Sequence, residues 1–182
     1  MRTSTARDGF TLVEVLVVIA VIAILAGVSV PQIGGLMRRY ALNSATRQVA
    51  SVIRSSRYTA VSKNRIVRVR FNCPAAGQFR VVEVVGSAAV DNDVNRCSET
   101  NYGYPDPDTA AAPDVDGPIH RLPSDAQFVG VQDIQFDTQG RAQRLIGCPA
   151  CVAAAAPATV VTGNGYETQT LTISASGQVL AQ

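Results

Sequence analysis

The sequence predicts an α+β protein in which one long N-terminal helix is followed by a mostly antiparallel β-sheet head domain. Three observations indicate this fold. Residues 10–30 form a nearly continuous apolar run, and residues 42–60 carry apolar side chains at helical spacing. From Ile66 onward the pattern changes to the alternation of a β-strand. The first two features join into a single helix, and the third marks where the head begins.

The apolar run at residues 10–30 is long enough, as a helix, to cross a bilayer. Its 21 residues would rise about 30 Å, the thickness of the hydrocarbon core. One acid, Glu14, interrupts it, and an ionised carboxylate at the bilayer centre costs about 3 kcal/mol. We therefore expect a transmembrane helix whose single acid has a function. The simpler alternative is a signal anchor in which Glu14 reaches the lipid headgroups.

A short basic leader, residues 1–9, precedes the apolar run. It contains Arg2 and Arg7 and ends in Gly9, so the small residue comes before the apolar run. In a secretory signal the small-residue cleavage site follows the apolar core instead. Cleavage after Gly9 would leave Phe10 as the N-terminus of the mature chain.

These features resemble the class III leader of type IV pilins and type II secretion pseudopilins. The matching residues, in the family's order, are Gly9, Phe10, Thr11, Leu12, Glu14 and Pro31. The resemblance implies that a prepilin peptidase cuts between Gly9 and Phe10 and methylates the Phe10 amine. It implies that Glu14 pairs with the N-terminal amine of a neighbouring subunit. It also implies a single-pass inner-membrane protein, in contact with membrane lipid, whose periplasmic head later joins other pilins or pseudopilins in a filament.

The helix is expected to continue, kinked at Pro31, as an amphipathic stem over residues 31–62. Spacings of three and four predict one buried stripe, formed by Leu42, Ala45, Val49, Val52, Ile53, Ser56 and Ala60. Acidic residues are absent from Val15 to Val82, where basic residues are frequent, and acids dominate from Glu83 onward. We therefore expect a basic stem beneath an acidic head, with the head domain spanning residues 63–182.

Within the head, alternating and β-branched segments predict about six to eight strands. A hairpin is expected from residues 66–71 and 79–85, and further strands at residues 126–131, 134–137, 145–146, 159–162, 169–174 and 178–180. The alanine-rich residues 152–158 are interpreted as a loop because they contain Pro157 and follow a cysteine. The helix end, the connection at residues 62–65 and the first strand also resemble the start of the GspH/FimT branch of minor pilins.

Four cysteines, Cys73, Cys97, Cys148 and Cys151, allow three disulfide pairings. In an oxidising periplasm disulfides are more natural than catalytic thiols. We expect Cys73 with Cys97, which would tie the hairpin end to the following polar loop, and Cys148 with Cys151, which are close in sequence. A redox role for the CxxC pair is disfavoured because such motifs work at a helix N-terminus. A zinc site is disfavoured because Cys73 and Cys97 lack paired CxxC spacing.

The sequence predicts neither an enzyme nor a cofactor or metal site. His120 is the only histidine, and no phosphate-binding glycine-rich loop is present. The polar stretch at residues 86–122 holds pairs of aspartates that could bind calcium, but it lacks EF-hand spacing and is interpreted as a surface loop. These pairs are Asp91 with Asp93, Asp106 with Asp108, and Asp114 with Asp116.

Three classes of function remain open. The favoured one is a minor pilin or pseudopilin that co-assembles through its N-terminal helix and primes or caps a filament. The second is a DNA-binding minor pilin for DNA uptake, as in FimT-like proteins. FimT-like proteins carry a Gly-Arg-x-Arg element, which is missing at Gly177 and only approximated after Gly140. Arg141 and Arg144 are therefore the candidate DNA contacts. An acidic head would repel the phosphate backbone and so disfavours DNA binding. The third is a membrane-anchored periplasmic thiol protein.

The processing site gives a direct prediction. Replacing Gly9 with leucine should block cleavage, because the peptidase must closely accommodate the residue before the cut. Mass spectrometry should find Phe10 at the N-terminus of the wild-type chain and an intact leader on the Gly9→Leu chain. A wild-type N-terminus at any other residue would contradict the prediction.

Overall fold

The computed structural model describes residues 10–102, 104, 116–123, 126–146, 152–155 and 158–181. The chain divides into two compact units, residues 1–38 and residues 39–182, and each is described by itself. The first element is the 52-residue helix α1 (Leu12–Lys63), which continues through Pro31 as expected. Among the described residues, no helix is long and apolar enough to cross a membrane, and the span predicted at residues 10–30 is not confirmed.

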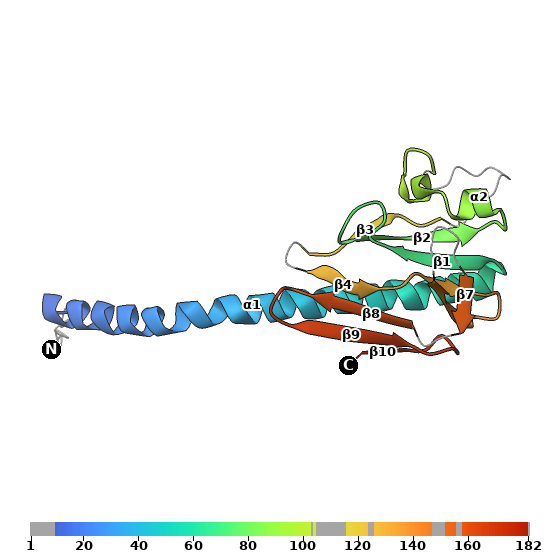
Figure 1. Cartoon of the computed structure of the whole chain (residues 1–182). Helices are drawn as coiled ribbons and strands as arrows, with labels where there is room; N and C mark the ends of the chain where they lie inside the picture. Colours follow the sequence, from blue (N-terminus) through green and yellow to red (C-terminus); the bar gives the residue numbers. More distant parts are fainter. Residues whose placement is uncertain are drawn as a thin grey trace, which may run out of the picture. The chain divides into compact units, whose positions relative to one another are not determined.

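Two antiparallel sheets make up most of the second unit (Figure 1). The larger sheet has the strand order β3-β2-β1-β5-β6-β7 and the smaller sheet has the order β10-β9-β8-β4. The larger sheet consists of β1 (Ile66–Phe71), β2 (Gln78–Val84), β3 (Ile119–Arg121), β5 (Ile134–Phe136), β6 (Ala142–Ile146) and β7 (Val152–Ala155). The smaller sheet consists of β4 (Gln127–Val131), β8 (Ala158–Gly163), β9 (Thr168–Ile173) and β10 (Val179–Ala181). The protein is therefore α+β, with a long N-terminal helix followed by antiparallel sheets, as the sequence predicts.

Two parts of the sequence-based strand assignment are wrong. Residues 152–158 were interpreted as a loop, but Val152–Ala155 forms β7 and pairs with β6 in the register Ile146 opposite Val152. Alanine has a low β-propensity, so the pairing with β6, and not the local sequence, decides this strand. The stretch at residues 86–122 was interpreted as a surface loop, but it contains the short helices α2 (Ala88–Asp91) and η1 (Val94–Cys97) and the strand β3. The ten strands of the described chain exceed the number expected.

One hydrophobic core fills the space between both sheets and the part of α1 that belongs to the second unit. It joins Val49, Ala50, Ile53 and Ala60 of α1 to Val67, Val69, Ile134, Phe136, Val160, Leu171 and Ile173 of the strands. The predicted stripe is confirmed, because all of its members are buried except the partly buried Val52. The polar Ser56 fits this stripe because its hydroxyl donates to the carbonyl of Val52 at 2.7 Å.

Two hairpin turns meet at Arg57 of α1. Gly140 lies in the turn between β5 and β6, Gly177 lies in the turn between β9 and β10, and both have a φ of 76°. Arg57 Nε donates to the carbonyl of Gly140 at 3.0 Å. A Cβ at Gly177 would lie 2.5 Å from the Gly140 oxygen and 2.8 Å from Arg57 Cδ. Position 177 therefore requires glycine for two reasons. Its φ is positive, and a Cβ there would collide with the neighbouring turn and with Arg57.

Alanine substitutions separate these two requirements. Gly165 has a φ of 80° and open space around its Cβ position, so Gly165→Ala should cost only the backbone strain, about 1 kcal/mol. Gly177→Ala should lower the free energy of unfolding by at least about 1 kcal/mol more, because it also displaces Arg57 and the neighbouring turn. Urea denaturation of both variants measures the difference, and equal losses would show that the two turns do not pack as described.

Candidate functional site

Helix α1 begins with a capped first turn. The backbone N–H of Glu14 donates to the hydroxyl of Thr11 at 3.3 Å and to its carbonyl at 3.1 Å. Thr11 thus satisfies one of the four N–H groups that a helix start leaves without a partner. Glu14 stands at the third helical position, where a carboxylate interacts favourably with the helix dipole. The pattern Thr-x-x-Glu is a capping-box sequence and could have located this helix start from the sequence.

Apolar side chains cover every side of α1 in the first unit, and all of those described are exposed. They occupy nearly consecutive positions: Leu12, Val13, Val15, Leu16, Val17, Val18, Ile19, Val21, Ile22, Ile24 and Leu25. A globular surface helix keeps a polar face, whereas a helix that is apolar all round is buried in a larger core or in lipid. This part of the chain therefore presents an apolar surface that the chain itself does not cover.

Phe10, the predicted cleavage and methylation residue, and Glu14, the predicted assembly residue, lie on one side of this surface. Together with Val15, Val18 and Ile19 they line a shallow hollow of about 270 Å³. Phe10 itself is 83% exposed. Gly9, the predicted cleavage residue, lies outside the described residues. The arrangement offers a neighbouring helix an apolar recess with one carboxylate in it.

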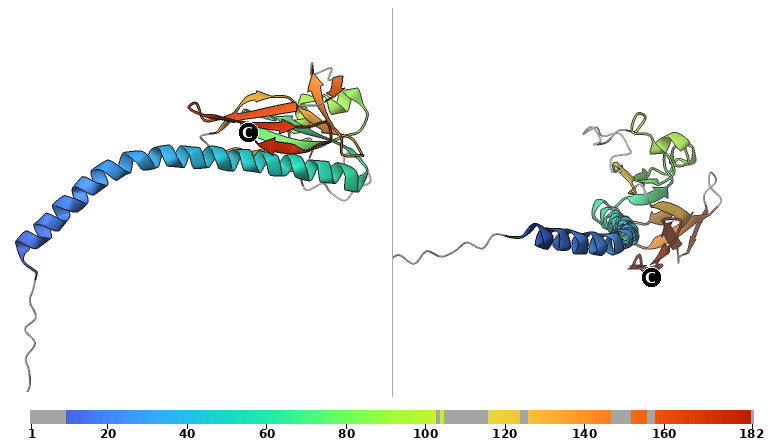
Figure 2. Two further views of the ribbon diagram at one scale, coloured as in Figure 1. Left: turned by 90° about the horizontal axis from the view of Figure 1, so that it is seen from below. Right: turned by 90° about the vertical axis from the view of Figure 1, so that its left-hand side faces the viewer.

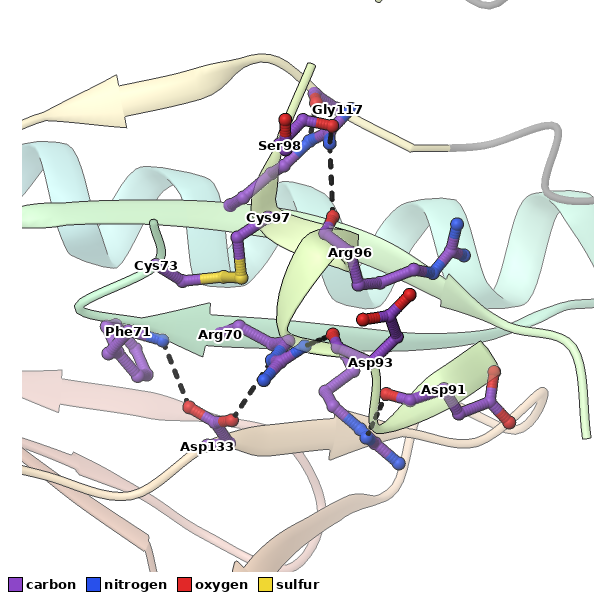
Figure 3. The surroundings of a disulfide bond; sticks show 12 residues. Arg70, Phe71, Cys73, Asp91, Asp93, Arg96, Cys97, Ser98, Gly117 and Asp133 are labelled. Atoms are coloured by element: carbon purple, nitrogen blue, oxygen red, sulfur yellow. Dashed lines mark hydrogen bonds and ion pairs between the residues drawn. A yellow bond between two sulfur atoms is a disulfide. The ribbon is translucent and has the colours of Figure 1, made fainter. Parts of the chain in front are cut away.

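Cys73 and Cys97 form a disulfide that ties the end of β1 to η1, with Cα atoms 5.2 Å apart (Figure 3). This is the pairing that the sequence predicts. The other predicted pair, Cys148 with Cys151, lies outside the described residues.

Beside the disulfide, two fully buried arginines hold the segment that follows β2. Arg80 of β2 donates to four carbonyls of this segment. Its Nε donates to Gly117 at 2.8 Å, its Nη1 to Arg96 at 3.1 Å and to Ser98 at 3.4 Å, and its Nη2 to Tyr102 at 2.7 Å. Burying a guanidinium is tolerable only when its N–H groups find acceptors. Arg80 therefore acts as the polar centre around which this segment folds.

The second buried arginine, Arg96, is paired with a buried acid. Its Nη1 lies 2.9 Å from Asp116 Oδ2, and its guanidinium carbon lies 4.5 Å from the centre of the Tyr102 ring. Asp116 Oδ1 also accepts from the backbone N–H of Glu83 at 2.7 Å, which connects the pair to β2. Sequence reasoning missed both Arg80 and Arg96, because periodicity does not show which face of a strand a later segment covers.

Two further arginines, Arg68 and Arg70, lie in β1 within the predicted head and bind the segment that follows β2. Arg68 Nη1 donates to the carbonyl of Asp91 at 3.0 Å, and Arg70 Nη1 donates to the carbonyl of Asp93 at 2.9 Å (Figure 3). These positive charges therefore lie within the head, where backbone carbonyls solvate them.

The candidate calcium ligands that are described have other roles. The carboxylate of Asp91 accepts from the backbone N–H groups of Val85 and Gly86 at 2.8 and 3.0 Å. Asp106, Asp108 and Asp114 lie outside the described residues. In the part of the chain that the structure describes, no group of three or more His, Cys, Asp or Glu side chains is placed to hold a metal ion.

The two candidate DNA contacts do not form one surface. Arg141 precedes β6 and is exposed, with its Nε 2.8 Å from Asp137 Oδ2. Arg144 lies within β6, and its Nε is buried without a hydrogen-bond partner. Side chains three positions apart on an extended chain point to opposite faces. The geometry therefore does not favour the DNA-binding alternative.

His120 and Asp133 of the head have shifted pKa values and structural contacts. Burial lowers the pKa of His120, whose ring stacks on Phe79 with centroids 5.1 Å apart. Burial raises the pKa of Asp133, although a hydrogen bond from the Phe71 N–H at 3.0 Å and the nearby Arg70 oppose this. His120 therefore packs against β2 from the neighbouring strand, and Asp133 is tied to the end of β1.

The disulfide gives the prediction for this region. Replacing Cys73 and Cys97 with alanine opens a loop closed across 24 positions, and the free energy of unfolding should fall by about 3 kcal/mol on chain-entropy grounds. Denaturant unfolding of the oxidised wild type and the double variant measures this loss, and the reduced wild type is the matched control. Peptide mapping that linked Cys73 to Cys148 or Cys151 in solution would contradict the pairing.

Comparison with known protein families identifies a motif in the N-terminal segment. Residues 5–30 match the family model described as the prokaryotic N-terminal methylation motif. No curated protein matches the chain. Two crystal forms of the type IV minor pilin FimU from Pseudomonas aeruginosa strain PAO1 are similar at 15% identity. Their TM-scores are 0.49 and 0.47, and the alignments cover 81% and 78% of this chain and 92% of each FimU chain. The chain thus carries a prokaryotic N-terminal methylation motif at the start of an α+β fold with a long first helix.

Proposed function

We propose that this chain is a minor pilin or pseudopilin that co-assembles through the N-terminal part of α1 into a type IV pilus or a type II secretion pseudopilus, where it primes or caps the filament. The observation that carries the proposal is the exposed, all-round apolar surface of this helix with a single carboxylate, Glu14, beside Phe10. The methylation motif at residues 5–30 supports it. The proposal needs no catalytic group, cofactor or metal.

Processing and location belong to the same proposal. A prepilin peptidase would cut after Gly9 and methylate the new N-terminal amine of Phe10. Before assembly, residues 10–30 would lie in the lipid of the inner membrane, with the head in the periplasm. The disulfide between Cys73 and Cys97 supports an oxidising location for the head, because reducing compartments keep thiols free.

The proposed assembly step is electrostatic. After cleavage the chain carries a positive amine at Phe10 and a negative carboxylate at Glu14, in the first turn of α1. Each charge is unfavourable by itself in an apolar environment. A neighbouring subunit, staggered along the filament axis, can bring its amine to Glu14 and thereby neutralise both charges. The apolar surface then gains neighbours on all sides, and the charge pair sets the register of the subunits.

Substituting Glu14 tests this step. Glu14→Ala should still be cleaved, remain in the membrane fraction and form the Cys73–Cys97 disulfide, because none of these depends on the carboxylate. Its amount in sheared filaments or in complexes with other prepilin-like subunits should fall at least tenfold, as measured by quantitative immunoblotting. Glu14→Gln should fail in the same way, since it keeps the size of the side chain but lacks the charge.

Val17→Ile is the matched control for this experiment. It keeps an apolar side chain on the same helix and changes no charge, and its incorporation should stay close to wild type. Wild-type incorporation of Glu14→Ala would show that charge pairing does not drive assembly of this subunit.

A further inference from the structure

A groove in the head runs beside α1 and contacts the last two strands of the smaller sheet. Two hollows form it. One, of about 300 Å³, is lined by Asn43, Thr46, Arg47, Ala50, Arg54, Gln169, Leu171 and Ala181. The other, of about 350 Å³, is lined by Arg54, Arg57 and residues 177–180. Because Arg54 lines both hollows, we treat them as one feature, the α1–β10 groove. In Figure 2 the ribbon of the last strand, coloured dark red, lies beside the second half of α1, and Arg54 contacts Val179 of that strand.

The α1–β10 groove is positively charged. Three arginines line it, Arg47, Arg54 and Arg57, and none of its lining residues is acidic. Arg57 is bound to the carbonyl of Gly140 at 3.0 Å, and Arg54 makes a long hydrogen bond of 3.4 Å to the carbonyl of Val179. Arg47 is exposed and has no hydrogen bond or ion pair within the described chain. The groove therefore presents cationic donors without a carboxylate of its own to neutralise them.

The strand beside this groove has a free edge. β10 is the outermost strand of the smaller sheet in the described chain. The Ser174 N–H donates to the Gln178 carbonyl at 2.9 Å. In an antiparallel pair, hydrogen-bonded and non-hydrogen-bonded residue pairs alternate, so Thr172 and Leu180 form the next hydrogen-bonded pair. The backbone groups of Val179 and Ala181 then point away from β9. A free strand edge of this kind can pair with another extended chain.

We propose that the α1–β10 groove binds an extended, acidic segment of a neighbouring protein. Arg47 and Arg54 stand two helical turns apart, about 10 Å along the axis. Alternate residues of an extended chain share one face at a spacing of about 7 Å, so carboxylates on that face can reach both flexible guanidinium groups. The segment's backbone meets the outward groups of β10 other than the Val179 carbonyl, which Arg54 already contacts. Apolar side chains of the segment rest on Leu180, which lines the groove and is exposed. The proposal concerns the head alone and does not depend on assembly through Glu14.

A nucleic acid is the competing anionic ligand, and the lining disfavours it. Proteins that bind single strands stack the bases on aromatic side chains. The residues that line the two hollows include no aromatic one, but they include Ala50, Leu171, Val179 and Leu180. An apolar wall beside a strand edge suits a peptide better than a phosphate backbone.

Fluorescence anisotropy on the full-length, detergent-solubilised chain tests the proposal. The probe is a labelled eight-residue peptide of alternating valine and glutamate, and a peptide of alternating valine and glutamine is its uncharged counterpart. The acidic peptide should bind at least tenfold more tightly than its counterpart. Arg47→Gln combined with Arg54→Gln should weaken its binding at least tenfold. Arg47→Lys should retain most of the affinity, since it keeps the charge.

Arg121→Gln is the matched control, because Arg121 is an exposed arginine of β3 that does not line the groove. It should change the affinity less than twofold. Thermal unfolding of every variant confirms that the head is folded, and Arg47→Gln alone provides the test if the double variant unfolds. Equal weakening by Arg121→Gln, or tighter binding of a twelve-residue oligothymidylate through Arg47 and Arg54, would overturn the proposal. A loss of filament incorporation confined to Glu14 variants would leave it standing.

Discussion

The buried stripe on the second half of α1 is the constraint on which the head depends. Leu42, Ala45, Val49, Ile53 and Ala60 are all almost completely removed from solvent, and both sheets pack against this one face. Burial of each large aliphatic side chain contributes about 1.5 to 3 kcal/mol. The opposite face of the helix needs no apolar residue, so it can carry the arginines that line the α1–β10 groove. In the first unit the same helix has apolar residues on every side and lacks a sheet to cover them.

Polar and ionic interactions, and not apolar burial, stabilise the segment after β2. This segment offers few apolar side chains, and it folds around charged groups instead. Arg80 collects its carbonyls, Arg96 pairs with Asp116, and the disulfide from Cys73 to Cys97 limits the unfolded chain. A buried ion pair of this kind costs desolvation. The backbone of Glu83 offsets part of this cost, because its carbonyl accepts from Arg96 Nη2 at 2.6 Å and its N–H donates to Asp116 Oδ1 at 2.7 Å. The polar segment therefore gains a defined structure without a hydrophobic core of its own.

The two proposed contact surfaces use opposite charges in different units of the chain. Glu14 is a lone carboxylate on an apolar helix, and its environment makes a cationic partner favourable. The α1–β10 groove presents arginines beside a free strand edge, and an acidic partner suits it. Opposite charges reduce the chance that one partner occupies both surfaces, because like charges placed together are unfavourable. A subunit built in this way could contact different neighbours through its first helix and its head.

The sequence by itself determined α1, its buried stripe and most strands, because helical and strand periods are local properties. It favoured the Cys73–Cys97 pairing among three possible ones, and the structure contains this disulfide. Only the tertiary structure decided that Val152–Ala155 forms a strand, since its hydrogen bonds come from β6. It also decided the burial of Arg80 and Arg96 and the meeting of Gly140 and Gly177 at Arg57. These features depend on groups far apart in the chain, and no local pattern records which of them come together when the sheets close on the helix.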